Sequence, residues 1–257
     1  MNIGVGDAPS TSRASPRAYF LHGAGAWGGQ WAIWRRVFEA GAWQVETPDL
    51  QPAAAGLAAT RLDHYVEQAS AALRACAASD SAAIADQRRP PTLLVGASLG
   101  GLVALAAAAR ATPDARPRAL VLINPLPPAP FAANLPPFAL DGDIVPWRSQ
   151  GRFASTVRAL PDASFTDRQL AFRCWRDESA AVLREAHAGV VLAVPVLPVL
   201  VMASVADDAV PPEVSAAFAS SIGASVIRVP GGHVDAVMGA SAAATAHAAL
   251  AWWRTLG

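Results

Sequence analysis

Short apolar runs of strand length alternate along this chain with longer segments in which apolar residues recur every three or four positions. The runs lie at residues 18–21, 43–46, 92–95, 119–123, 199–202 and 225–229. The segments of helical periodicity lie at residues 29–40, 61–78, 99–110, 212–220 and 239–255. Strands that alternate with helices in this way form mostly parallel sheets with helices on both faces. The pattern therefore predicts an α/β fold with about six strands.

The alternation is interrupted once, over residues 125–190, where a cluster of prolines is followed by two or three short helical pieces. A connection of this length in a compact domain is either functional or disordered. Seven aromatic side chains favour a folded, functional segment, because we do not expect them to be left in water. They are Phe131, Phe138, Trp147, Phe153, Phe165, Phe172 and Trp175. We interpret residues 125–190 as a small helical lid over the carboxyl edge of the sheet, inserted between core segments 18–124 and 191–257, with residues 1–17 as a flexible N-terminal tail.

The charges argue against two classes of partner. The 257 residues include 20 basic and 20 acidic side chains, so the formal net charge is zero, and every basic residue is arginine. Without a field of one sign, we expect neither nucleic-acid binding nor binding to an anionic membrane. The sequence also contains no signal-peptide pattern and no apolar run long enough to span a bilayer. We therefore expect a cytoplasmic protein whose partner is a small molecule.

Cofactor and metal sites are not expected either. Cys76 and Cys174 lack the spacing of metal ligands and are too few for a disulfide framework, which predicts reduced thiols. The Gly-Ala-Gly at residues 23–25 lacks the third glycine and the acidic residue of a dinucleotide site. Trp252 and Trp253 are adjacent on the last helical segment and cannot both face one core. One of them is a candidate contact of a weak homodimer, and the chain is otherwise expected to be a monomer.

The most informative motif is Gly-Ala-Ser-Leu-Gly at residues 96–100, which joins an apolar run to a helical segment. A Gly-x-Ser-x-Gly between strand and helix is the context of a nucleophile elbow. Small residues two before and two after the serine keep neighbouring elements from colliding at so sharp a turn. The free amides at the helix start also favour negative charge that develops at Ser98. Ser98 is our candidate nucleophile; the alternative is an ordinary capping serine at a glycine-rich helix start.

A nucleophilic serine needs a base, and the base needs an orienting carboxylate. His233 follows the apolar run at 225–229 in a Gly-Gly-His sequence, so we assign it as the base, with a helix-capping loop histidine as the alternative. The other candidates fall inside predicted helices: His64, His187 and His247. Asp207 and Asp208 both follow the run at 199–202, and neighbouring side chains cannot both face the histidine. We favour Asp207 as the acid and keep Asp208 as the alternative.

Backbone amides must also be aimed at the oxygen that becomes negative during acyl transfer. The amide of Leu99, directly after the candidate nucleophile, is the first expected donor. The second is expected from the loop after the first strand, where glycines permit a turn that presents the Ala24 amide. His22 in this loop is interpreted as a structural hydrogen-bonding residue, because it precedes the nucleophile and another base is already assigned.

These motifs resemble those of α/β-hydrolase fold enzymes, across essentially residues 18–257. The matching residues are Phe-Leu-His-Gly at 20–23 with Trp27 behind it, the elbow at 96–101, the acid region at 198–211 and Gly-Gly-His at 231–233. The chain order of serine, acid and histidine is the order that the superfamily uses. In family members a Gly stands three residues before the acid and a Val-Pro follows. Here Val210-Pro211 selects Asp207, whereas Ser204 stands in the place of the Gly.

The resemblance implies an α/β-hydrolase fold with a small lid, near the methylesterase and hydroxynitrile lyase branch. Dehalogenases and epoxide hydrolases carry an aspartate at the elbow, dienelactone-type members carry a cysteine, and related hydroxynitrile lyases depend on a lid lysine that this chain lacks. We therefore predict a serine esterase that cleaves carboxylic esters of small to medium apolar acyl groups through an acyl-enzyme on Ser98, without cofactor or metal. Trp147 and Trp175 are candidate walls of the acyl pocket.

Other activities remain open at this point. The same triad supports hydrolysis of carbon–carbon bonds, hydrolysis of thioesters and perhydrolysis. Some members of the superfamily are non-catalytic receptors for small molecules. Labelling of Ser98 by a fluorophosphonate distinguishes the receptor from the enzymes.

Overall fold

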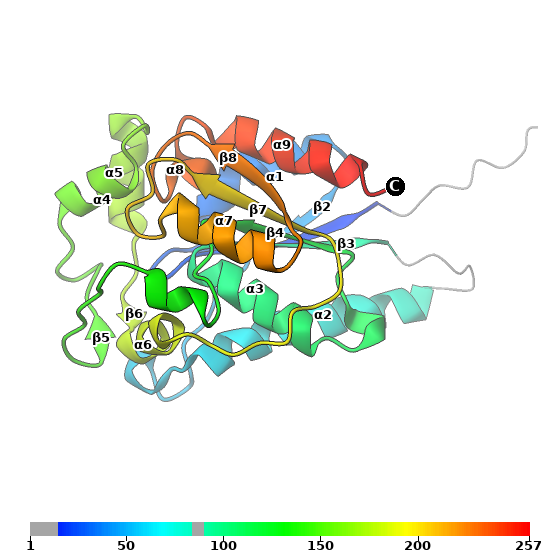
Figure 1. The fold of residues 1–257 in the computed structure, drawn as a ribbon, viewed down its shortest axis with the longest axis horizontal. Coiled ribbons are helices and arrows are strands. Elements are labelled where there is room, and N and C mark those ends of the chain that lie inside the picture. The colour runs from blue at the N-terminus through cyan, green and yellow to red at the C-terminus, as the bar shows by residue number, and fades with distance from the viewer. Residues whose placement is uncertain (1–14, 84–89) are drawn as a thin grey trace, which may run out of the picture.

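The predicted strands form one sheet. The computed structural model describes residues 15–83 and 90–257. Its six-stranded sheet has the order β2-β1-β3-β4-β7-β8, and all neighbouring strands are parallel (Figure 1). The strands are β1 (Arg17–Leu21), β2 (Gln44–Glu46), β3 (Thr92–Ala97), β4 (Ala119–Ile123), β7 (Val199–Ser204) and β8 (Ser225–Val229). Each apolar run of the sequence forms one of them, so the predicted α/β class and the strand number are confirmed.

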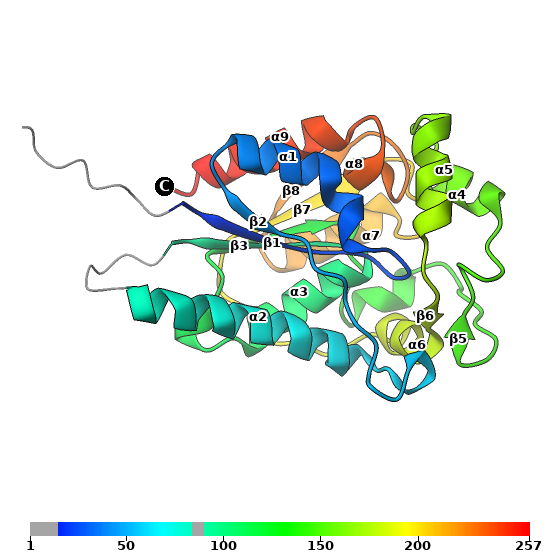
Figure 2. The ribbon, with the colours of Figure 1, turned by 180° about the vertical axis from the view of Figure 1, so that it is seen from behind.

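Helices cover both faces of this sheet (Figures 1 and 2). On one face lie α1 (Ala32–Ala40), α8 (Asp235–Met238) and α9 (Ala242–Arg254), and on the other lie α2 (Leu62–Ala83), α3 (Leu99–Arg110) and α7 (Pro212–Ser221). All five predicted helical segments are helical, with shifted bounds. A 3-10 turn, Gly28–Trp31, precedes α1, and α2 runs five residues past its predicted end. The last segment begins at Ala242 because α8, which the sequence did not predict, ends before the extended Gly239.

The alternation of side chains along each strand divides the core into two layers. On β4, Leu120 and Leu122 belong to the cluster with α2 and α3, whereas Val121 and Ile123 belong to the cluster with α1 and α9. A strand that is buried on both faces reads as a continuous apolar run, which is why periodicity alone did not assign these residues to a face.

One layer is filled by aromatic rings. Trp31, Trp34 and Phe38, which are spaced three and four residues apart, are fully buried against Phe20 of β1. Their ring centroids lie 5.1 to 6.1 Å from that of Phe20, in tilted or edge-to-face arrangements. Such pairs add to the free energy gained by burial.

Residues 125–190 lie at the end of the molecule where the parallel strands finish, on the left in Figure 1 and on the right in Figure 2. They contain β5 (Ile144–Val145), α4 (Phe153–Ala159), α5 (Phe165–Cys174), β6 (Glu178–Ser179) and α6 (Ala180–Ala188), with a 3-10 turn at Phe131–Asn134. The antiparallel pair β5–β6 was not predicted, because two residues are too few to show a period.

The aromatic residues of this segment differ in burial. Phe165 is 62% exposed and Phe138 is 44% exposed, so the expectation that none of the seven would face water is wrong. The short helices α4 and α5 have too few neighbours to cover every ring. Phe165 keeps an edge contact with Phe153, and Phe138 stacks on His187.

Trp252 and Trp253 both pack, partly buried, against the cluster with α1 and α9, contrary to the expectation that one of them must turn away. Each reaches a different flank of α9. The Trp253 ring lies 4.9 Å from that of Trp43, whereas the Trp252 indole N–H donates to Ser225 Oγ at 3.3 Å. A contact of either with a second copy stays a prediction.

The predicted tail at residues 1–17 lies outside the described residues as far as residue 14, and Arg17 already begins β1. Within residues 15–83 and 90–257, no helix is both long and apolar enough to cross a membrane.

Candidate active site

Ser98 lies on the sharp turn between β3 and α3. Its φ of 53° and ψ of −121° are rare for a residue with a side chain, and such strain is typical of functional positions. The glycines on either side are needed for space. A Cβ on Gly96 would lie 2.2 Å from the Gly100 carbonyl oxygen, and one on Gly100 would lie 2.3 Å from that of Leu21. This is the crowding that the sequence predicted for a nucleophile elbow.

The backbone of Ser98 is tied to the neighbouring strand. Its N–H donates to Ile123 O at the end of β4 at 2.9 Å, and its carbonyl accepts from Leu126 N at 3.1 Å. The Leu99 amide begins α3, and within the described chain it donates no hydrogen bond. A helix start with free amides beside a half-buried serine favours negative charge at this point.

The loops after β7 and β8 bring His233 and Asp207 together. His233 Nδ1 lies 2.7 Å from Asp207 Oδ2. The other carboxylate oxygen accepts the amides of Ala209 and Val210, both at 2.9 Å. The Asp207 side chain is completely buried, whereas that of His233 is 16% exposed. The carboxylate is therefore fixed by its own loop and orients the imidazole with Nδ1–H toward it, which leaves Nε2 without a proton in the neutral ring.

Asp208 points elsewhere. Its side chain is 65% exposed and lies 3.9 Å from Arg158 of α4. Of the two neighbouring aspartates, the structure pairs Asp207 with the histidine.

Two opposing effects act on the pKa of His233. Burial of the ring disfavours its charged form, but the Asp207 carboxylate, its hydrogen bond and the nearby Asp208 charge favour it, and the net result is a raised pKa. Within the described residues, Ser98 Oγ makes no hydrogen bond to His233. In enzymes without bound substrate such bonds are often long and tighten in the complex.

Asn124, which the sequence analysis did not single out, connects three strand ends. Its amide nitrogen donates to Ser204 Oγ and to His233 O, both at 2.8 Å, and its amide oxygen accepts from Ser204 N at 2.7 Å. Ser204, which stands where family members carry a Gly, is therefore the partner of Asn124. The position of Asn124 directly after β4, beside the elbow, is the signal that could have found it.

Asp235, also missed, holds the histidine loop. It is fully buried, and its Oδ2 accepts the Gly232 amide at 2.7 Å. Burial raises the pKa of its carboxyl group, against the effect of the backbone amides that it accepts. Asp235 stands two residues after His233, but this spacing does not by itself indicate that the side chain is buried under the histidine loop.

The loop after β1 lies beside the elbow. A Cβ on Gly23 would lie 3.2 Å from Ser98 Cβ and 3.8 Å from Ser98 Oγ. The Ala26 amide donates to Gly23 O at 3.2 Å, which closes a turn with Ala24 and Gly25 at its centre. Within the described chain the Ala24 amide donates no hydrogen bond, so, like that of Leu99, it is free to bind another acceptor.

His22 is held by backbone groups. Its Nδ1 lies 2.8 Å from Gly23 O, and its Nε2 accepts the Leu50 amide at 2.9 Å. Burial lowers its pKa to about 4, so the ring is neutral with Nδ1 as the donor. This arrangement agrees with the structural role expected for it.

The two candidate pocket residues have different surroundings. The Trp147 ring lies against the α-carbon of Gly25, where a Cβ would come within 2.2 Å of it. Trp175 donates its indole N–H to Thr156 Oγ1 at 2.9 Å and packs edge-on against Trp27 at 5.9 Å. Trp147 thus touches the turn that carries Ala24, whereas Trp175 is anchored between α4 and the core.

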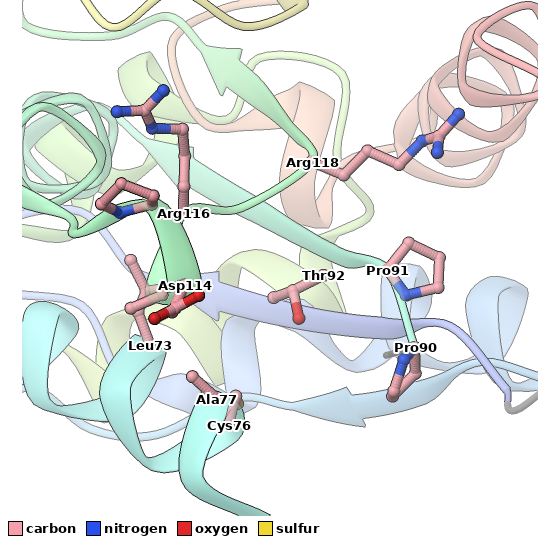
Figure 3. A pocket seen from close by; sticks show the side chains of 11 residues that line it. Leu73, Cys76, Ala77, Pro90, Pro91, Thr92, Asp114, Arg116 and Arg118 are labelled. Carbon is pink, nitrogen blue, oxygen red and sulfur yellow. The ribbon is translucent and has the colours of Figure 1, made fainter. Parts of the chain in front are cut away.

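Two hollows lie elsewhere on the molecule. One of about 470 Å³ lies at the opposite, amino end of the sheet, and Thr92, Asp114, Arg116 and Arg118 are among the residues that line it (Figure 3). The other, of about 380 Å³, lies between α4 and α5 and is lined by Phe153, Phe165, Gln169, Phe172 and Arg173. Neither is lined by any of the candidate catalytic residues. Among the described residues, no group of three or more His, Cys, Asp or Glu side chains is arranged to hold a metal ion.

Comparisons with known proteins identify the family. The sequence matches the model described as "Alpha/beta hydrolase family" over residues 18–248. No curated protein matches the chain. Among solved structures, a pyrethroid hydrolase from Sphingobium faniae JZ-2 has a TM-score of 0.66 at 17% identity, covering 93% of this chain and 97% of the other. Polyneuridine aldehyde esterase has a TM-score of 0.65 at 17% identity, with coverages of 92% and 100%.

Tomato methylketone synthase I, in complex with 2-tridecanone, has a TM-score of 0.69 at 14% identity, with coverages of 94% and 99%. Likeness at such low identity shows a common fold. The family match, in contrast, spans most of the sequence. The chain therefore belongs to the alpha/beta hydrolase family.

Proposed function

We propose that this protein is a serine hydrolase that cleaves carboxylic esters of small to medium apolar acyl groups through an acyl-enzyme on Ser98. The observation that carries the proposal is the buried 2.7 Å pair of His233 and Asp207 at the sheet edge that holds the strained Ser98 turn. Each member comes from the end of a different parallel strand, in the order serine, acid and histidine.

In the proposed reaction, His233 Nε2 takes the proton of Ser98 as the hydroxyl oxygen attacks the ester carbonyl. Asp207 keeps the proton of the neutral ring on Nδ1 and stabilises the imidazolium that forms. The carbonyl oxygen, now negative, accepts the amides of Ala24 and Leu99. The protonated histidine then gives its proton to the leaving alcohol, and the acyl group stays on Ser98.

Water completes the cycle. His233 removes a proton from a water molecule that attacks the acyl-enzyme, and the same two amides bind the second oxyanion. Collapse of this intermediate breaks the bond to Ser98 Oγ, which takes the proton back from His233. The carboxylic acid leaves, and no cofactor or metal takes part in the proposed cycle.

We expect the proposed acyl pocket to be apolar, because the aromatic ring of Trp147 adjoins the turn that carries the Ala24 amide. Each methylene that it buries contributes up to about 0.8 kcal/mol, which is up to about fourfold in kcat/KM. We expect kcat/KM to rise from acetyl esters to a maximum at a small or medium acyl chain. Two of the similar structures are named as a pyrethroid hydrolase and a polyneuridine aldehyde esterase, and both names are consistent with a hydrolytic reaction. We further propose that the enzyme is cytoplasmic and either monomeric or weakly dimeric.

Labelling with a fluorophosphonate tests the nucleophile. The wild-type chain is expected to take up one equivalent, on the peptide that contains Ser98, whereas Ser98→Ala is expected to take up none. For nitrophenyl esters the same variant should lose about 10⁴-fold or more in kcat, because the members of a triad act as a unit.

The matched control is Ser220→Ala, which removes an exposed serine of α7 and is expected to behave as the wild type. Retention of a tenth of the activity by Ser98→Ala would contradict the covalent mechanism. A wild-type chain that is neither labelled nor active on esters would instead favour the non-catalytic receptor. Thioesters and diketones, assayed in parallel, decide between the proposed esterase and the other hydrolytic activities.

A further inference from the structure

The turn that carries Ala24 is held by residues outside the sheet core. Ala24 and Gly25 occupy its two central positions, and Gly25 has a φ of 63°, as the third residue of a type II turn requires. The turn closes through the Ala26 amide, so the two central amides are not used by the turn itself. The amides of Ala24 and Gly25 can therefore each bind an acceptor outside the turn.

Glu178 of β6 accepts one of these two amides. Its Oε2 accepts the Gly25 amide at 3.0 Å, across 153 positions of sequence. Its Oε1 accepts the Tyr65 hydroxyl and the Ser179 amide, both at 2.8 Å. Glu178 is 4% exposed, and burial of a carboxylate is costly unless donors satisfy it. Three donors meet this need, yet the candidate triad makes no use of the residue.

The lid also holds the rest of Gly25. The Arg176 amide donates to Gly25 O at 2.6 Å, and the Arg176 guanidinium donates to Leu50 O at 2.9 Å. The Trp147 ring closes the space at the α-carbon. The amide, the carbonyl and the α-carbon of Gly25 therefore all face residues of the lid.

We propose that Glu178 is a positioning residue for the oxyanion hole. By accepting the Gly25 amide it fixes the plane of the turn, and the amide of Ala24 remains directed to the substrate oxygen. Glu178 touches neither the substrate nor Ser98, and it acts through Gly25. The inference rests on the proposed ester hydrolysis. An oxyanion donor binds most strongly when charge develops, so loss of its position lowers kcat more than it changes KM.

Glu178→Gln is the most selective test. The glutamine oxygen can keep the Tyr65 and Ser179 donors, but its NH₂ group then meets the Gly25 N–H, donor against donor. We expect kcat for nitrophenyl esters, per fluorophosphonate-titrated site, to fall about 10- to 100-fold, with KM changed by less than about threefold. Affinity for an aryl trifluoromethyl ketone, which forms a tetrahedral adduct with an active serine, should fall by a similar factor.

A matched control exists on α6. Glu185 also accepts a backbone amide that joins the lid region to the core, that of Leu62 at 2.9 Å, but its other partner is the Arg61 guanidinium and not the turn after β1. Glu185→Gln should therefore keep kcat and ketone affinity within about twofold of the wild type. Glu178→Asp, which keeps the charge and withdraws the carboxylate by one methylene, provides a second variant where the glutamine protein fails to fold.

The results separate this inference from the proposed function. If the wild type hydrolyses esters and either Glu178 variant keeps wild-type kcat and ketone affinity, the positioning role is overturned and the proposed function stands. A rise in KM at unchanged kcat also overturns it, because Glu178 then acts on substrate binding. If the wild type neither hydrolyses esters nor is labelled, the proposed function is contradicted, and the inference that rests on it is contradicted as well.

Discussion

The two halves of the candidate site are held by different parts of the chain. In the acid–base half, the partners of the His233 ring come from the core: Asp207 lies in the loop after β7, and the amides that fix it belong to the same loop. In the oxyanion half, the turn after β1 is held by Glu178 and Arg176, which belong to the lid.

Within the described residues the lid contacts the histidine loop as well, but it makes no hydrogen bond to the imidazole ring. The Val234 amide donates to Ala159 O at 3.0 Å, and the Asp162 amide approaches Asp235 at 3.3 Å. The hydrogen bond to the imidazole ring is therefore made by a residue of the core and not by the lid. We therefore expect changes in the core to alter proton transfer, and changes in the lid to alter oxyanion binding and acyl preference.

The largest effect is expected at Asp207. Asp207→Asn removes the carboxylate that fixes the histidine tautomer and should lower kcat by about 10⁴-fold. Asp208→Asn, the matched neighbour, should stay within a few-fold because its side chain is 65% exposed and faces Arg158. Steady-state kinetics with one nitrophenyl ester measures both. The opposite ranking would contradict the assignment of Asp207 and would make Asp208 the acid.

The pH dependence of kcat/KM is a second test of the acid–base half of the site. A general base must be neutral, so kcat/KM should rise with pH through the pKa of His233 and level off above it. Because the neighbouring carboxylates raise that pKa, the midpoint should lie above the ordinary value of 6.5. In Asp208→Asn it should move to lower pH, since one of the raising charges is lost.

The measurement is kcat/KM from pH 5 to 9 at constant ionic strength, with a substrate for which chemistry limits the rate. Glu213→Gln, an exposed charge of α7, serves as the control for a general change of charge. A profile that is flat over this range would contradict His233 as the base.

A smaller effect is expected in the lid. Trp147→Leu should change the preferred acyl length by one or two methylenes, up to about fourfold in relative kcat/KM for each, because its ring adjoins the oxyanion turn. Trp175→Phe should keep the preference and lower the free energy of unfolding by about 1 kcal/mol, since it loses the bond to Thr156.

A series of nitrophenyl esters from acetyl to decanoyl, with urea unfolding of each variant, measures both quantities. A wild-type profile that is highest at acetyl or rises through the longest chains would mean that the lid does not close an acyl pocket. An equal shift in both tryptophan variants would mean that the two residues line one pocket together.

The sequence alone predicted the parts of the site that depend on local geometry. The turn at Ser98 needs Gly96 because a Cβ there would meet the Gly100 carbonyl, and it needs Gly100 because the end of β1 passes close by. Both needs are visible in one five-residue pattern. The apolar runs gave the strands for the same reason, because a buried strand requires a continuous apolar stretch. Once parallel strands were expected, the order of Ser98, Asp207 and His233 placed all three at one edge of the sheet.

The tertiary structure decided what depends on contacts between distant segments. Which aspartate turns inward follows from the amides of Ala209 and Val210, and Asn124 meets Ser204 80 positions away. The pairing of Glu178 with Gly25 spans 153 positions and leaves no periodic signal in either segment. A backbone turn restricts which residue types can stand at neighbouring positions, so it leaves a pattern in the sequence. A hydrogen bond between two loops depends on how the layers pack, and only the folded chain brings its donor and acceptor together.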